Sequence, residues 1–282
     1  MSRKANPALS TGWEKVNLPP EAVLLDVTRC CHPVRHNESA IDSFYENQAE
    51  TLRLGNPTAL ADSSTLGRLL ILGLVTGVEA YFRNVLHGAT TFCPLVRQAI
   101  SEQMIALGAV DFYGADQAAL GLFERVSFAG GEEIKKRTKA MLGLPIADNS
   151  SLGAALDAFD IVCHMRHASV HTQGVLSRGN AQALGIFNNR TQIHLVVDLP
   201  HLHMAAKACM GVVRAYNLFA YQGILQRWLN ERILTGVWKT DKSYFAPLYK
   251  LFRSETDAIG PASAYSTYKL FRPAIVARLA GT

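Results

Sequence analysis

The segment 62–87 constrains the fold most, because its apolar side chains occur on almost every face of the helix that their spacing predicts. These side chains are Leu66, Leu69, Leu70, Leu74, Val78, Tyr81, Phe82 and Val85. A helix that is apolar all round has to be covered by other elements, so the rest of the chain must surround it. Its most apolar stretch, 69–78, is shorter than the roughly 20 residues that cross a bilayer. We therefore expect a central core helix and no membrane partner.

Helical periodicity and helix termini recur along the chain. Besides 62–87, the ranges that we expect to be helical are 39–54, 94–107, 116–123, 131–142, 150–171 and 200–232. Strand patterns occur only at 182–187 and 192–199, with the polar run Asn188-Asn189-Arg190 between them, and they predict one hairpin. The expected fold class is therefore all-α, a helical bundle with one small β-hairpin.

Composition divides the chain into three expected regions. Residues 1–61 form an N-terminal arm and a helix, 62–235 a helical domain, and 236–282 an extension rich in basic and aromatic residues. This extension could grip RNA through phosphate contacts and base stacking. The alternative, which we favour, is that its helices are amphipathic and pack on the core with their basic side chains outward.

Charge and cysteine content narrow the function classes. The chain carries 28 basic and 23 acidic residues, a net charge of +5, which suits a polyanionic partner without requiring one. Its five cysteines include no C-x-x-C pair, which argues against a disulfide framework or a cysteine-rich zinc site and fits a reducing compartment. The first residues lack the apolar core of a secretory signal, so we expect a cytoplasmic protein.

The segment 160–174 concentrates the residues that carry chemistry. His164, His167 and His171 share one face of the predicted helix, at i, i+3 and i+7. Arg166 lies roughly 140° round the helix from His171, so both can face one ligand only where the helix ends or unwinds. Gly174 marks the expected end of this helix.

An arginine beside a histidine suits cleavage of RNA. The guanidinium keeps its charge and makes bidentate hydrogen bonds to phosphate oxygens, which stabilises the charge that develops in the transition state. A histidine titrates near neutral pH, so it can take the proton of a ribose 2′-OH or protonate the departing 5′ oxygen. The histidines could instead hold zinc, but the sequence offers no obvious third ligand. We therefore expect no metal and no cofactor.

Two motifs resemble those of HEPN domains. Arg166-His167-x-x-x-His171 resembles the R-x4–6-H signature, in the form where a polar residue follows the arginine. The segment Glu79-Ala80-Tyr81-Phe82-Arg83 resembles the acidic E-x3-K/R motif that HEPN nucleases carry on an earlier helix. The two motifs also occur in the expected order. The resemblance spans roughly residues 62–232 and is closest to RiboL-PSP-type, defence-associated HEPN proteins.

The resemblance implies a fold and an activity. HEPN domains are helical bundles that usually dimerise, so that the R-x4–6-H helices of two protomers form a composite site. Many are metal-independent endoribonucleases that leave 2′,3′-cyclic phosphate and 5′-OH ends. The resemblance therefore implies a homodimer that cleaves RNA, such as tRNA or mRNA, in phage defence or as a toxin. It also implies a protein partner, which would be an antitoxin or another part of a defence system.

The resemblance also assigns roles by matching position. Arg166 would bind and stabilise the scissile phosphate, His171 would be the general base or acid, and His167 would tune or orient it. Glu79 would hold Arg166 or Arg83 in an ion pair. Arg83 and His164 would contact RNA. Some HEPN domains keep the fold without cleaving, so the alternative is a non-catalytic module that binds nucleic acid or a protein.

Overall fold

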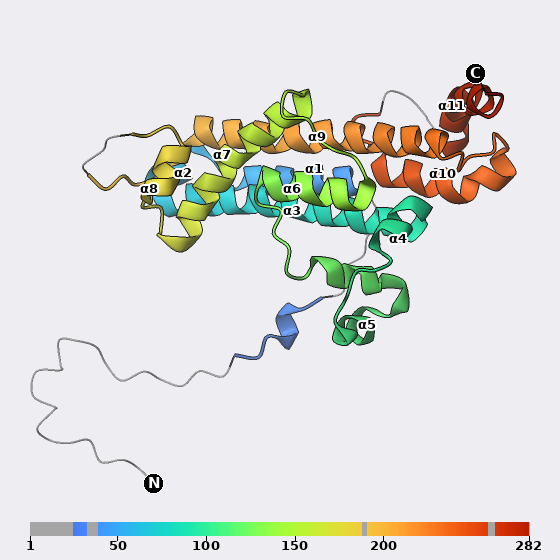
Figure 1. The fold of residues 1–282 in the computed structure, drawn as a ribbon. Helices are drawn as coiled ribbons and strands as arrows, with labels where there is room; N and C mark the ends of the chain where they lie inside the picture. The colour runs from blue at the N-terminus through green and yellow to red at the C-terminus, as the bar shows by residue number, and fades with distance from the viewer. Residues whose placement is uncertain (1–24, 33–38, 188–190, 259–262, 282) are drawn as a thin grey trace, which may run out of the picture. The chain divides into compact units, whose positions relative to one another are not determined.

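The computed structural model describes residues 25–32, 39–187, 191–258 and 263–281, and these residues are mostly helical (Figure 1). The chain divides into two compact units, Met1–Asn37 and Glu38–Thr282. The described part of the first unit contains one short 3₁₀ helix, Thr28–Cys30. The second unit contains the other helices of the described residues, including Ala40–Arg53 and those of the segment 236–282, which sequence analysis treats as separate regions.

The centre of the second unit is α3, Ser64–Phe92, which begins at an N-cap hydrogen bond from the Leu66 N–H to the Ser63 hydroxyl. Its buried side chains lie on several faces, as the all-round apolar pattern predicts. α1 (Ala40–Arg53), α7 (Ser151–His171) and α9 (Leu199–Asn230) pack on it and lie roughly side by side (Figure 1). By length and composition alone α3 could cross a membrane, but 61% of its most apolar stretch is buried inside the structure.

Shorter helices connect and flank these four. They are α2 (Pro57–Asp62), α4 (Pro94–Ile100), α5 (Leu107–Tyr113), a 3₁₀ helix at Ala115–Phe123, α6 (Gly131–Arg137), a π-helical turn at Thr138–Leu142, and α8 (Arg178–Ala183). Both α6 and α8 contact α7, so they border the segment that sequence analysis identifies as chemically important.

The predicted β-hairpin is not confirmed. The first expected strand, 182–187, instead begins inside α8, which starts after the Ser177 N-cap and ends at Ala183, and it contains Gly185, whose φ of +76° is the left-handed conformation typical after a helix end. The second predicted strand pairs elsewhere, through a single antiparallel bridge between Val175 and His194. Residues 188–190, the predicted turn, lie outside the described residues. The first strand pattern was misleading because the end of α8 and Gly185 interrupt it. The second was misleading because its backbone partner is Val175, which lies outside the expected hairpin.

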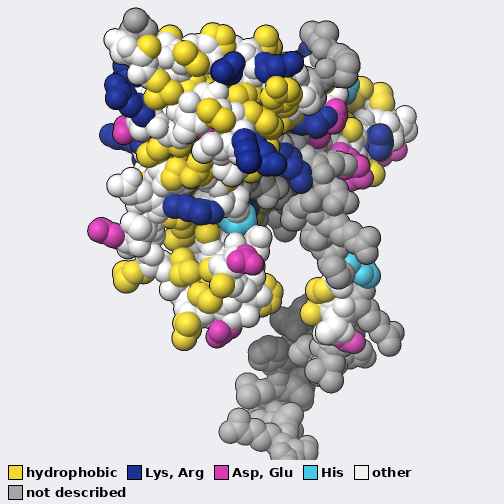
Figure 2. All heavy atoms as spheres, turned by 90° about the vertical axis from the view of Figure 1, so that its right-hand side faces the viewer, with side chains coloured by type: hydrophobic (Ala, Val, Ile, Leu, Met, Phe, Trp, Pro, Cys, Tyr) yellow, Lys and Arg dark blue, Asp and Glu magenta, His cyan; other side chains and the backbone are white. Residues whose placement is uncertain are grey.

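The C-terminal segment forms α10 (Trp238–Phe252) and α11 (Ala264–Leu279), which pack on each other and on α9. Three of its aromatic side chains, Phe245, Phe252 and Tyr268, are buried in the core, whereas Tyr265 is exposed. Figure 2 shows the face that carries these helices, where Lys and Arg side chains are scattered among hydrophobic ones instead of forming one continuous field. This arrangement is that of amphipathic helices packed on the core.

Candidate functional site

The helix α7 presents the predicted residues at its C-terminal end. It starts where the Ser150 hydroxyl accepts a hydrogen bond from the Gly153 N–H, at 3.0 Å. It ends at His171, because Gln173 and Gly174 adopt left-handed φ values of +52° and +92°. The Gly174 N–H then donates to the carbonyl of Ala168, at 2.9 Å, which closes the last turn. The predicted helix end is therefore confirmed.

The three histidines lie along one face of α7, as their spacing predicts. The rings of His167 and His171 are in contact, with centroids 4.5 Å apart, and both side chains are exposed. His164 is half-buried, and its Nδ1 lies 3.3 Å from Oδ1 of Asn180 on α8. The histidine face of α7, defined as His164, His167 and His171, is thus supported by α8 at one end and open to solvent at the other.

Arg166 lies next to this face without being part of it. Its side chain is half-buried, and its Nε is buried with no hydrogen-bond partner. The charge of Arg166 contributes to lowering the pKa of His167 and acts on the Cys163 thiol, so the guanidinium is close to both. A buried N–H without an acceptor is uncommon in folded proteins.

A pocket of about 350 Å³ borders the upstream part of the histidine face. We call it the α6–α7 pocket; its walls are Ala129–Glu133 and the side chains of Asp160, Cys163, His164, His167 and Asn180. The Gly131 N–H donates to Oδ1 of Asp160, at 2.6 Å, which ties the start of α6 to α7. Burial raises the pKa of the Cys163 thiol, so this group stays protonated and is a poor nucleophile. Arg166 and His171 are not among the residues that line the pocket.

The acidic motif on α3 holds the loop that leads into this pocket. Oε1 of the buried Glu79 accepts hydrogen bonds from the Ser127 hydroxyl and the Phe128 N–H, both at 2.8 Å. Arg83 forms an ion pair with the same oxygen at 3.8 Å, and its Nη2 donates to the Val126 carbonyl at 2.8 Å. Glu79 makes no ion pair with Arg166 among the described residues. The motif therefore holds the segment 126–128, which precedes the pocket wall, through two backbone groups and the Ser127 hydroxyl.

Sequence analysis missed two side chains of this region. Asp160 precedes His164 by one helical turn, so its place on the same face was visible in the spacing. Asn180, whose side chain is 6% exposed, reaches His164 from another helix, and no local pattern identifies such a contact. Together they fix the upstream end of the histidine face.

Electrostatics in this cluster predict a measurable shift for one histidine. Burial, followed by the positive charges of His171, Arg166 and His164, lowers the pKa of His167 below its ordinary 6.5. Replacing Arg166 or His171 by glutamine is expected to raise this pKa, whereas His203→Gln, at a residue that does not act on His167, leaves it unchanged. NMR titration of the His167 ring protons measures the shift, and an unchanged midpoint in both variants would contradict the prediction.

The lowered pKa of His167 also predicts how the stability of the fold changes with pH. Because the folded state holds the His167 proton more weakly than the unfolded chain, its contribution is present above pH 6.5 and is lost as the pH falls through the lowered value. Acidification from about pH 7 to 5 should therefore destabilise the wild type slightly more than His167→Gln.

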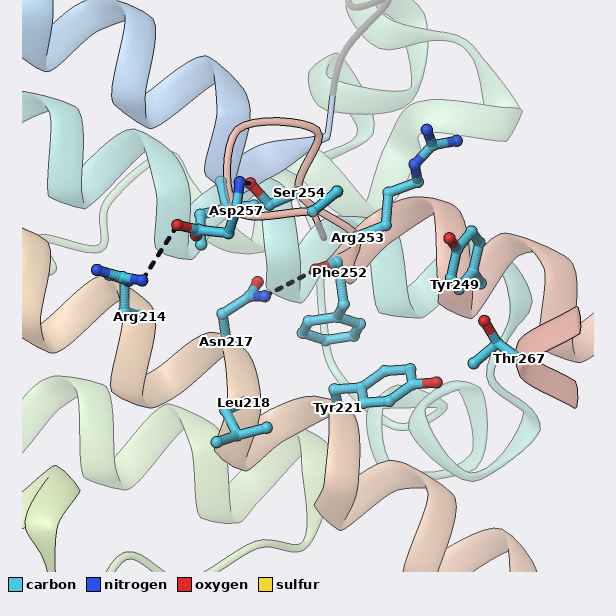
Figure 3. A pocket seen from close by; sticks show the side chains of 12 residues that line it. Arg214, Asn217, Leu218, Tyr221, Tyr249, Phe252, Arg253, Ser254, Asp257 and Thr267 are labelled. Atoms are coloured by element: carbon cyan, nitrogen blue, oxygen red, sulfur yellow. Dashed lines mark hydrogen bonds and ion pairs between the residues drawn. The ribbon is translucent and has the colours of Figure 1, made fainter. Parts of the chain in front are cut away.

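A second pocket, of about 370 Å³, lies between α9, α10 and the residues after α10 (Figure 3). Its residues Arg214, Asn217 and Asp257 are already paired. Nη2 of Arg214 lies 3.1 Å from Asp257, which also accepts a hydrogen bond from the Tyr45 hydroxyl, and the Asn217 amide donates to the Phe252 carbonyl at 2.7 Å. These contacts hold the chain after α10 against α9 and α1, so we assign the pocket a structural role.

Within the described ranges, no group of three or more His, Cys, Asp or Glu side chains is arranged to hold a metal ion. Comparisons of the chain with family models, with curated proteins and with solved structures found no match. The function is therefore argued from the two motifs and from the geometry around the C-terminal end of α7.

Proposed function

We propose that this protein is a metal-independent endoribonuclease of HEPN type that acts on RNA, such as tRNA or mRNA, in the cytoplasm. The observation that carries the proposal is the cluster at the end of α7, where the rings of His167 and His171 are in contact and the charge of Arg166 acts on His167. A guanidinium and imidazoles at one helix end are the groups that cleavage by a 2′-OH requires. Phage defence or a toxin–antitoxin system is the biological setting that the resemblance implies.

The proposed reaction needs two proton transfers. A histidine, His171 in our assignment, removes the proton of the ribose 2′-OH, and the oxygen attacks the adjacent phosphorus. The bond from phosphorus to the 5′ oxygen breaks, and a second imidazole protonates that oxygen. The products are a 2′,3′-cyclic phosphate and a 5′-OH. Arg166 stabilises the extra charge on the phosphorane, and the lowered pKa of His167 keeps a neutral imidazole beside His171 at pH 7.

The proposed site is completed by a second copy of the chain. A two-fold axis through the ends of two α7 helices would bring two copies of His171 together, so that one acts as base and the other as acid. The exposure of His167 and His171 leaves this end of the helix open to such a partner. In the same proposal Glu79 positions the pocket wall, while Arg83 and His164 contact the RNA flanking the scissile bond. An antitoxin or other defence-system protein would act on this dimer.

One observation favours a non-catalytic HEPN-type module that binds nucleic acid or a protein. The Nε of Arg166 is buried, so the guanidinium lies partly under the surface. Consistent with this, Arg166 does not line the α6–α7 pocket. If it stays there in the dimer, Arg166 has a structural role and the histidine face only binds.

A cleavage assay distinguishes the proposed nuclease from the non-catalytic binding module. The purified protein is incubated in EDTA with total tRNA and with a transcribed mRNA, and the ends of the fragments are analysed. We expect fragments with 2′,3′-cyclic phosphate and 5′-OH termini. Activity that disappears in EDTA and returns with zinc would indicate a metal hydrolase. Absence of cleavage, with RNA still retained in a binding assay, would indicate the non-catalytic module.

A further inference from the structure

A pocket of about 570 Å³ lies on the side of α7 away from the histidine face, against the first turns of α3. We call it the Arg68 pocket. Its polar side chains are Ser64, Thr65, Arg68, Ser169, Gln173 and His194. No Asp or Glu side chain is among the residues that line it. The pocket therefore carries one permanent positive charge and no negative charge.

Arg68 is the unusual member, because its side chain is buried, with 8% exposed, and lacks a carboxylate partner. Nη1 donates to the Ser64 hydroxyl at 3.3 Å and Nη2 to that of Thr65 at 3.0 Å, and no ion pair of the described part of the chain includes Arg68. Burial of an unpaired charge is strongly unfavourable. Neutral oxygens compensate only part of that cost, and a guanidinium has more N–H groups than these partners use.

His194 does not compensate for the unpaired charge of Arg68. Its Nε2 lies 3.3 Å from Nη1 of Arg68 and 3.0 Å from the carbonyl oxygen of Gln173. A nitrogen that donates to the carbonyl cannot also accept from the guanidinium, so one of the two contacts is always unsatisfied. An anion that accepts from Arg68 would remove this conflict, because the Nε2–H of His194 could then donate to the Gln173 carbonyl.

The backbone holds this arrangement in place. Gly174 has a φ of +92°, and a Cβ there would lie 2.6 Å from Cδ of Arg68 and 3.1 Å from Nε2 of His194. Only glycine lets both side chains lie against the chain at this point. The neighbouring Gln173 has a φ of +52°, which is uncommon for a residue other than glycine and costs conformational energy. The guanidinium-bearing side chain of Arg68 on α3 therefore lies against a strained turn.

From these observations we infer that the Arg68 pocket binds a phosphate group, either free or carried by a nucleotide. The planar guanidinium matches phosphate oxygens, and the hydroxyls of Ser64 and Thr65, which accept from Arg68, can donate their own protons to the same anion. Exposed Leu69 and Val170 flank the pocket and offer an apolar surface to a nucleoside. The inference does not rest on the proposed nuclease activity, since it concerns binding alone.

Calorimetric titration of the full chain tests it with inorganic phosphate, with adenosine 5′-monophosphate and with adenosine. We expect saturable binding of at least one phosphate-bearing probe, weakened by salt, and none of adenosine. Tighter binding of the nucleotide than of inorganic phosphate would assign the pocket to a nucleotide, and equal binding would assign it to the free anion. Failure of both phosphate-bearing probes to bind, or equal binding of adenosine and its monophosphate, would overturn the inference.

A substitution at an exposed residue on the rim of the Arg68 pocket tests the inference without disturbing the buried Arg68. Leu69 is 56% exposed, so Leu69→Glu should fold, and its carboxylate at the pocket rim should weaken phosphate binding by about 10-fold or more. Leu218→Glu is the matched control, because Leu218 is 57% exposed on α9 and does not line the Arg68 pocket. Equal affinities of the wild type and Leu69→Glu would place the anion elsewhere and overturn the inference.

Discussion

Under the proposed nuclease function, Arg166→Ala and His171→Ala are each expected to lower RNA cleavage by about 100-fold or more. Arg166 supplies the charge that stabilises the phosphorane, and His171 moves the proton of the 2′-OH. Arg166→Lys should lose most of the activity as well, because an ammonium keeps the charge but not the planar pair of donors. Initial rates on one RNA substrate in EDTA, at equal protein concentration, measure the effect.

The controls separate chemistry from folding and assembly. Arg278→Ala removes an exposed guanidinium from α11, which is not in contact with α7, and should leave the rate unchanged. Circular dichroism should show the same helix content in every variant, and sedimentation should show the same dimer mass. Wild-type rates in both Arg166→Ala and His171→Ala would exclude a catalytic role for this helix end. A monomeric wild type at micromolar concentration would argue against a composite site.

The ends of α7 could be predicted from sequence because local chemistry sets them. Ser150 is a hydroxyl residue at the N-cap, and Gly174 follows the last turn where a left-handed residue is needed. The same local logic puts the three histidines on one face, since their spacing follows the helical repeat. The all-round apolar pattern of α3 likewise predicts its central place, because a helix without a polar face has to be covered.

The surroundings of the site could not be predicted in the same way. The Glu79 carboxylate binds the Ser127 hydroxyl and the Phe128 N–H, far along the chain, and Asn180 reaches His164 from α8. The extended segment around His194 pairs with Val175 instead of with the predicted strand. Each of these contacts depends on which elements pack together, which the spacing of residues within one element does not specify. The uncompensated charge of Arg68 is a property of that packing as well.

Asp241→Ala is expected to lower the free energy of unfolding by about 3–5 kcal/mol, the largest stability effect that we expect outside the apolar core. The Asp241 side chain is only 1% exposed. Its carboxylate accepts hydrogen bonds from the N–H groups of Thr235 and Gly236, both at 2.9 Å, and from the Tyr268 hydroxyl at 2.6 Å. Alanine would leave these donors without their acceptor and weaken the link between the turn before α10 and α11, which would then depend on the hydrogen bond from Arg272 to the Gly236 carbonyl. Urea unfolding monitored by fluorescence measures the change.

Graded variants test this explanation, because the cost should follow the number of donors that lose their acceptor. Tyr268→Phe removes one hydrogen bond and should cost about 1 kcal/mol. Lys242→Ala, at the next and exposed position, should change stability by less than about 0.5 kcal/mol. If Asp241→Ala cost no more than Lys242→Ala, the carboxylate would not be what holds α11 to α10. The tilted and edge-to-face ring contacts of Tyr268 with Trp238 and Phe245 would then be the stabilising contact.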